Sequence, residues 1–217
     1  MARLRKAARM WRDPEKRALA MRVLVAEDGP LYADGPLYAI DPERLFGRRA
    51  PLEVELGAGR GDFIIEYAAQ RPDRDFLAVE LAASVARVLA LRAARRGLPN
   101  LRVARMDART LVNLMLPNAC LSACHVYFPD PWLTLSQQKH RMFSSGFAER
   151  LKRVLAPGAM VHVATDVEPY AMEMFAMLAS AGFRRVEVVA PGARASGFGL
   201  KYLAAGKAVF SASFGMT

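Results

Sequence analysis

A glycine-rich turn directly after a short apolar strand pattern constrains this chain more than any other feature. Residues 52–61 read LEVELGAGRG, and a second strand pattern, FLAVE, ends on Glu80, 25 residues after Glu55. In open α/β sheets such a turn lets the backbone approach a ligand, and an acid about 20 residues further on can accept hydrogen bonds from ribose hydroxyls. The pattern therefore predicts a nucleoside cofactor held by Glu55, Gly57, Gly59 and Glu80.

The spacing of this turn favours S-adenosylmethionine over a dinucleotide. Position 62 is Asp, so the motif reads G-x-G-x-G and lacks the third glycine of the dinucleotide fingerprint. Glu55 precedes the turn and would face the cationic amino and sulfonium groups of S-adenosylmethionine, which has no pyrophosphate to place at a helix N-terminus. The alternative is a tight strand–helix turn without a ligand, and the position of Glu80 argues against it.

Strand and helix patterns alternate from Pro51 onward. Strands are predicted at 52–56, 76–80, 101–106, 121–128, 159–164, 185–190 and 207–214. Helices are predicted at 61–70, 84–96, 144–155 and 168–181. Strands separated by helices indicate a mostly parallel sheet, and the last two strands, with no helix between them, indicate an antiparallel C-terminal edge. We expect a Rossmann-like α/β domain with a seven-stranded sheet at residues 51–217, after a basic arm and turn-rich lead-in at residues 1–50.

Charge and composition narrow the partners and the compartment. The net charge is +10, and residues 1–22 carry eight Lys/Arg against two acids, which favours binding to an RNA backbone over the alternative of a merely solvated surface. No apolar run is long enough to span a bilayer and no secretory signal is evident, so we expect a cytoplasmic protein without a membrane partner. Cys120 and Cys124 are expected to be buried thiols, and the three histidines show no metal-ligand spacing.

Acidic residues follow five of the predicted strands, at the edge where open α/β sheets bind ligands. They are Glu55, Glu80, Asp107, Asp130 and Asp166. Asp107 is placed to accept from an adenine N6 amino group. In FPDPW (128–132) two prolines stiffen the turn around Asp130, beside Trp132. A rigid carboxylate beside an aromatic ring suits the Watson–Crick edge of guanine, whose N7 needs no general base, so catalysis would be mainly orientation. The alternative is a purely structural turn.

Five segments resemble, in order and in spacing, the bacterial tRNA (guanine-N7-)-methyltransferase family. They are ELGAGRGDF, FLAVE, NLRVARMDA, FPDPW and ATDVEPYA, and the resemblance covers roughly residues 40–214. It implies a class I S-adenosylmethionine-dependent methyltransferase that modifies N7 of a tRNA guanine, expected to be guanine 46 in the variable loop. It further implies cofactor contacts from Glu55, Glu80, Asp107 and Asp130, a catalytic centre at Asp130, and a guanine contact from Asp166. The sequence does not fix the oligomeric state; a monomer is expected.

Two acceptor-binding motifs depart from that family. After FPDPW the chain continues LTLSQQKHR, so Thr134 stands where the family has a lysine that contacts substrate. Near the C-terminus the family's T-x-F-E motif matches Ser196, Gly197, Phe198 and Gly199, so the glutamate is lost while Ser196 and Phe198 remain candidate substrate contacts. The cofactor half of the family pattern is intact, whereas the acceptor half has changed.

Three functions remain in view. The first is methylation of guanine N7 in tRNA, with binding shifted toward the basic arm at residues 1–22. The second is methylation of another RNA site or of a small nitrogen heterocycle by the same fold. The third is a catalytically silent RNA-binding protein, which would have no reason to keep Glu55, Glu80 and Asp107.

Overall fold

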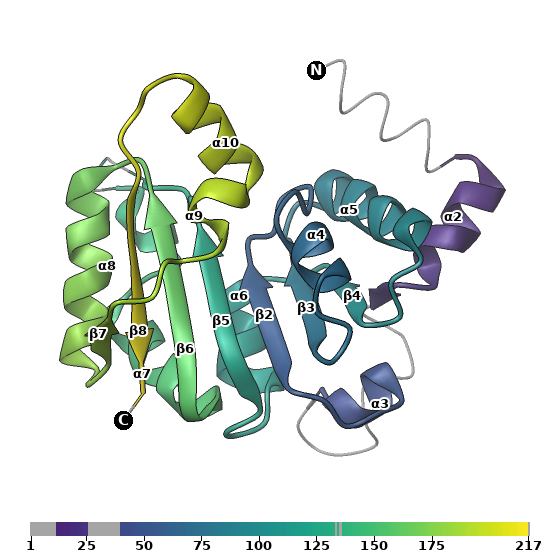
Figure 1. Cartoon of the computed structure of the whole chain (residues 1–217), viewed down its shortest axis with the longest axis horizontal. Helices are drawn as coiled ribbons and strands as arrows, with labels where there is room; N and C mark the ends of the chain where they lie inside the picture. Colours follow the sequence, from purple (N-terminus) through teal and green to yellow (C-terminus); the bar gives the residue numbers. More distant parts are fainter. Residues whose placement is uncertain (1–11, 26–39, 133, 135, 217) are drawn as a thin grey trace.

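One twisted sheet runs through the whole domain (Figure 1). The computed structural model describes residues 12–25, 40–132, 134 and 136–216, so half of the basic arm and much of the turn-rich lead-in lie outside the described residues. The strands lie in the order β1-β4-β3-β2-β5-β6-β8-β7. Their bounds are β1 (Leu24–Val25), β2 (Leu52–Leu56), β3 (Asp75–Val79), β4 (Leu101–Ala104), β5 (Leu121–Tyr127), β6 (Leu155–Thr165), β7 (Arg184–Val186) and β8 (Phe210–Gly215).

The strand directions confirm the predicted sheet. Every neighbouring pair from β1 to β6 is parallel, whereas β8 runs antiparallel to both β6 and β7. The seven predicted strands are β2 to β8, and β1 adds a two-residue strand at the edge beside β4. Because the chain steps from β2 toward β4 on one side and from β5 toward β6 on the other, the strand order reverses between β2 and β5.

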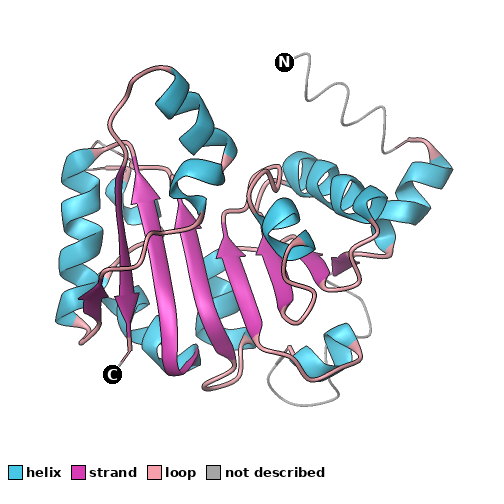
Figure 2. Ribbon diagram, in the orientation of Figure 1, coloured by secondary structure: helices cyan, strands magenta, loops and turns pink. Residues whose placement is uncertain are grey.

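Helices cover both faces of the sheet (Figure 2). One face carries α6 (Ala108–Thr110), the π-helical turn η1 (Leu111–Met115), α7 (Ser145–Val154) and α8 (Glu168–Ser180). The other face carries α4 (Ile64–Ala69), α5 (Ala83–Arg96), α2 (Pro14–Met21), which packs on α5, and α9 (Gly192–Ala195). The short α3 (Pro42–Phe46) leads into β2, and the turn η2 (Gln138–His140) precedes α7. No helix in the described part of the chain is long and apolar enough to cross a membrane.

The expectation that the last two strands follow each other without a helix is wrong. Both α9 and α10 (Gly197–Ala204) lie between β7 and β8, which still pair in antiparallel fashion. Their sequence, GARASGFGLKYLA, is rich in glycine and small residues, so it lacks the apolar period that marks a helix. Tertiary packing decides the outcome: a Cβ atom at Gly192 would lie 2.0 Å from the ring of Tyr127, so α9 can approach the sheet only with glycine there.

Strand β2 is buried along its whole length, and it carries two carboxylates into the interior. Leu52, Val54 and Leu56 belong to the core on the α7–α8 side. Because side chains alternate along a strand, Glu53 and Glu55 point to the opposite face. Glu53 is partnered there: its carboxylate accepts from His125 Nε2 at 2.8 Å and pairs with Arg74 at 3.0 Å.

Two stacked histidines extend this polar network across the sheet. The rings of His125 and His162 lie 5.0 Å apart, His125 Nδ1 lies 2.9 Å from the Tyr127 hydroxyl, and His162 Nδ1 lies 2.7 Å from Ser213 Oγ. Burial, followed by repulsion from His125, lowers the pKa of His162 to about 3. His162 is therefore buried in its neutral form.

The lowered pKa of His162 predicts that the protein loses stability on mild acidification. The unfolded chain takes up a proton near the ordinary histidine pKa of about 6.5 and the folded chain does not, so the free energy of unfolding falls as pH drops from about 6.5 toward 3. This group alone should cost about 2 kcal/mol between pH 7 and pH 5. Urea denaturation at both pH values should show a smaller loss for His162→Gln than for the wild type. The exposed His140→Gln variant is the control and should behave as the wild type; equal losses in all three proteins would contradict the assignment.

Candidate active site at the switch point

Glu55 lies one residue before the end of β2, beside the point where the strand order reverses. Ligands of open α/β sheets bind at this point, outside the carboxyl ends of the strands. The side chain is buried, and its Oε2 atom has no hydrogen-bond partner among the described residues. Burial first, and then the nearby carboxylates of Asp62 and Glu80, raise the pKa of Glu55 well above its ordinary value. A buried carboxyl group that has no partner and lies beside two carboxylates favours a cationic ligand.

The glycine turn follows Glu55 and is tied to the next strand. The backbone N–H of Gly57 donates to the carbonyl of Val79 at 2.9 Å, and that of Gly59 donates to Glu80 Oε2 at 3.0 Å. Both glycines have positive φ, and a Cβ atom at Gly59 would meet open space. At Gly61 a Cβ atom would lie 2.1 Å from Leu89 of α5, so this third glycine serves close helix packing. The structure thus brings together the turn and the acid that the sequence spacing paired.

Glu80 follows β3 and closes the turn from the other side. Its Oε1 atom accepts from the N–H of Ala82 at 2.7 Å, while Oε2 accepts from Gly59. An ionised carboxylate has about four acceptor positions, so these two backbone contacts orient Glu80 and leave capacity for two ribose hydroxyls.

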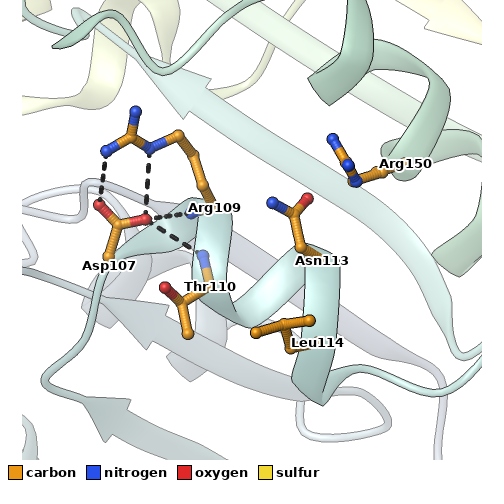
Figure 3. Close-up of a pocket in the computed structure, with 6 residues that line it drawn as sticks. All are labelled: Asp107, Arg109, Thr110, Asn113, Leu114 and Arg150. Atoms are coloured by element: carbon orange, nitrogen blue, oxygen red, sulfur yellow. Dashed lines mark hydrogen bonds and ion pairs between the residues drawn. The ribbon is translucent and has the colours of Figure 1, made fainter.

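Asp107 lies after β4 in an open pocket (Figure 3). The pocket has a volume of about 720 Å³ and is lined by Asp107, Arg109, Thr110, Asn113, Leu114 and Arg150. The carboxylate of Asp107 caps α6 by accepting from the N–H groups of Arg109 and Thr110, and it pairs with the Arg109 guanidinium at 3.3 Å. Burial raises the pKa of Asp107, but these hydrogen bonds outweigh it and lower the pKa overall. Asp107 is thus held as an ionised carboxylate.

The FPDPW loop after β5 is held in an unusual backbone conformation. Phe128 and Trp132 have φ angles of 52° and 41°, which bulky residues adopt only where the surroundings impose them, often at functional sites. Arg141 holds the loop: its Nε donates to the carbonyl of Pro131 at 2.7 Å, while its guanidinium pairs with Glu173 of α8. Asp130 itself is exposed at the tip. The loop is therefore braced against α8 and presents its carboxylate to solvent.

Asp166 follows β6 and lies near Tyr202 of α10. Burial, followed by the charge of this carboxylate, raises the pKa of Tyr202. The ring of Tyr202 lies 6.0 Å from that of Phe198 and 5.5 Å from that of Phe128. The aromatic neighbours of this edge are thus Phe128, Phe198 and Tyr202, while the ring of Trp132 lies 5.6 Å from His140.

The residues at the two altered motifs have clear structural positions. Ser196 is buried and caps α10 by accepting from the N–H of Gly199 at 3.1 Å. A Cβ atom at Gly199 would lie 2.3 Å from the Ala193 carbonyl oxygen, so the close packing of α9 and α10 excludes a glutamate there. Thr134 is exposed, and its hydroxyl donates to Gln137 Oε1 at 2.8 Å.

Sequence reasoning missed three residues of this region. Asp62 lies near Glu55 and pairs with Arg92 at 2.5 Å, and a Cβ atom at Gly197 would lie 2.3 Å from its Oδ2 atom. The other two are Tyr202, which lies near Asp166, and Arg141, which donates to the FPDPW loop. Only Asp62 had a signal, since it stands where a dinucleotide motif has glycine. Within the described residues, no group of three or more His, Cys, Asp or Glu side chains could hold a metal ion.

Comparison with known proteins places the chain in a family. Residues 49–191 match the profile of a family described as "Putative methyltransferase". The tRNA (guanine-N(7)-)-methyltransferase of Methylococcus capsulatus is 41% identical over 69% of this chain and 64% of its own length. The protein of the same name from Pseudomonas putida is 38% identical over 73% of this chain and 67% of its own length. The chain spans less than two thirds of the length of the Methylococcus relative and of the proteins of the same name from Nitrosomonas eutropha and Hydrogenovibrio crunogenus.

Solved structures with low sequence identity share the fold. The 16S rRNA methyltransferase KamB superposes with a TM-score of 0.64 at 16% identity, covering 90% of this chain and 99% of KamB. A SAM dependent methyltransferase from Aquifex aeolicus superposes with a TM-score of 0.57 at 17% identity, covering 82% of this chain and 94% of its own. These likenesses confirm the class I methyltransferase fold. The profile match and the sequence identities above show that the chain belongs to the bacterial tRNA (guanine-N(7)-)-methyltransferase family.

Proposed function

We propose that this protein transfers a methyl group from S-adenosylmethionine to N7 of a guanine in tRNA, with guanine 46 of the variable loop as the expected target. The observation that carries the proposal is the buried, unpartnered carboxylate of Glu55 beside an open glycine turn. The relatives at 36–41% identity are named for this reaction, which supports the choice of acceptor. The protein would act on tRNA in the cytoplasm, as a monomer.

The cofactor side of the site fits S-adenosylmethionine. Glu55 would face its cationic groups, since its free oxygen lies in a buried and negatively charged setting. Gly57 and Gly59 leave the backbone open to close approach, and Glu80 would accept from the ribose hydroxyls. Asp107 would accept from the adenine amino group with the capacity that Arg109 leaves free. When bound, S-adenosylmethionine supplies an electrophilic methyl group on a sulfonium sulfur.

The acceptor side would orient the guanine. Asp130 and Asp166 would accept hydrogen bonds from its N1–H and N2–H₂ groups, with Asp130 also bordering the cofactor. Guanine N7 carries a free lone pair, so the residues need not remove a proton before transfer, and their work is alignment. Their negative charge would also favour the positive charge that develops on the ring. Phe198 and Thr134 would contact the RNA from α10 and from the loop after FPDPW, and Ser196 would act by capping α10.

A second candidate is methylation of a different acceptor by the same site. It is favoured by the observation that Gly199 leaves no room for the family's glutamate and that Thr134 replaces its lysine. Losing a charged hydrogen bond costs about 1.5–3 kcal/mol, so two losses would weaken tRNA use considerably without abolishing it.

Methyl transfer from labelled S-adenosylmethionine to unmodified tRNA tests the proposal directly. We expect 7-methylguanosine when the modified nucleosides are identified by mass spectrometry. Asp130→Ala should lower kcat at least 100-fold, because the exposed carboxylate of Asp130 would align the guanine for transfer. Cofactor binding without 7-methylguanosine would contradict tRNA as acceptor, and full activity in Asp130→Ala would contradict the placement of the reaction centre.

Removing the brace on the FPDPW loop should slow the reaction without weakening cofactor binding. Arg141→Ala deletes the contacts to Pro131 and Glu173, so we expect kcat for tRNA to fall about 10-fold, as misplacement of reacting groups costs orientation. Arg153→Ala is the matched control, since Arg153 also donates to backbone carbonyls, those of Val112 and Leu116, away from this loop. Equal activity in the two variants would contradict a positioning role for Arg141.

A further inference from the structure

Three aromatic rings meet at the carboxyl ends of β5 and β6. Phe128 follows β5, and Phe198 and Tyr202 lie four residues apart on α10, so they share one face of that helix. Ring centroids lie 6.1 Å apart for Phe128 and Phe198, 5.5 Å for Phe128 and Tyr202, and 6.0 Å for Phe198 and Tyr202. We call these three residues the aromatic cluster. Figure 1 shows α10 above the ends of both strands.

The aromatic cluster lies at the surface. Phe198 is 54% exposed, and Phe128 and Tyr202 are half-buried, whereas other phenylalanines such as Phe76 and Phe147 are fully buried in the two cores. Phe128 is also held at a positive φ angle. Strained positions cluster at functional sites, and an exposed group of rings is a common platform for stacking nucleic-acid bases.

Charged groups around the aromatic cluster match a nucleotide. The ammonium groups of Lys201 and Lys207 lie 5.9 Å and 5.2 Å from the centroid of the Tyr202 ring, and both side chains are exposed. On the other side the carboxylate of Asp166 lies near Tyr202 and has acceptor positions free. One region thus combines the groups that bind a nucleotide: aromatic rings for stacking, cations for phosphate, and a carboxylate that can accept hydrogen bonds from a base edge.

We propose that Phe128, Phe198 and Tyr202 form a stacking seat for one unstacked purine base of the RNA acceptor, that Lys201 and Lys207 contact the neighbouring phosphates, and that Tyr202 orients Asp166 toward the base edge. This inference rests on the proposed function in that it takes the acceptor to be RNA. It would explain how the chain recognises its acceptor without the glutamate that Gly199 excludes and without the lysine that Thr134 replaces.

A protein partner is the competing occupant of this face. Leu200 and Leu203 of α10 are exposed, which would suit an apolar interface with a second copy of the chain. The two lysines and the ten surplus positive charges of the chain favour a polyanion instead. The seat is therefore assigned to RNA, and self-association becomes an outcome of the test.

Binding of a short single-stranded RNA that carries one 2-aminopurine tests the seat without requiring catalysis. Stacking on an aromatic ring quenches the fluorescence of this base. We expect quenching with the wild type, and a loss of affinity of about 5- to 100-fold in Tyr202→Ala and in Phe198→Ala, the range that base–aromatic stacking supports. Leu200→Ala is the matched control on the same helix and should bind as the wild type. Unchanged cofactor affinity in each variant shows that the fold is intact.

The conservative variant Tyr202→Phe separates stacking from positioning. It keeps the ring and loses the hydroxyl proposed to orient Asp166, so RNA affinity and KM for tRNA should stay near the wild type while kcat falls. Tyr202→Ala should instead raise KM as well. An unchanged kcat in Tyr202→Phe would contradict the orienting role of the hydroxyl.

Three results would overturn the seat: wild-type RNA affinity in Tyr202→Ala, an equal loss in Leu200→Ala, or a wild-type dimer in gel filtration that both substitutions dissociate. These results are distinguishable from failure of the proposed function. If the wild type methylates tRNA and Tyr202→Ala binds RNA equally well, the seat fails and the function stands. If the 2-aminopurine fluorescence is quenched on binding and RNA affinity depends on Tyr202, but no 7-methylguanosine forms, the stacking seat stands and the guanine-N7 reaction is contradicted.

Discussion

The buried carboxylate of Glu55 is the constraint around which the rest of the site is arranged. Burying an acid without a partner is costly, and this one shares its surroundings with the carboxylates of Asp62 and Glu80. Glu53, two residues earlier on the same face, shows how the chain treats a structural acid, because His125 and Arg74 both partner it. The contrast between the two glutamates supports the proposal that Glu55 binds a ligand, and a cation is the ligand that its negatively charged surroundings favour.

The residues proposed to bind the acceptor are held differently from those proposed to bind the cofactor. Glycines and backbone hydrogen bonds fix the turn beside Glu80, whereas side chains from separate elements surround the FPDPW loop and Asp166. Arg141 braces the FPDPW loop against α8, and Tyr202 of α10 lies near Asp166. Close packing of α9 on α10 requires Gly199 and removes the family's glutamate. The packing of these two helices thus leaves no room for the family's glutamate, and α10 carries Phe198 and Tyr202 in its vicinity.

The features that the sequence predicts correctly are those set by local pattern and spacing. The strand LEVEL, the parallel sheet and the meeting of the glycine turn with Glu80 follow from periodicity and from a turn motif with a known partner distance. Helices α9 and α10 could not be predicted, because their sequence has no apolar period. Their position is set instead by close packing against Tyr127 and Asp62. For the same reason Tyr202 and Arg141 carry no signal in the sequence: their partners are 36 and 32 residues away, respectively, at Asp166 and Glu173.

The most direct test of the account is calorimetry of S-adenosylmethionine binding to the wild type and to Glu55→Gln, in two buffers with different ionisation enthalpies. Because the pKa of Glu55 is raised in the free protein and a bound cation would lower it, wild-type binding should release protons and weaken as pH falls. Glu55→Gln should bind more weakly, release fewer protons and lose this part of the pH dependence. Equal affinity and equal proton release in the two proteins would contradict the role of Glu55 as the partner of a cationic cofactor.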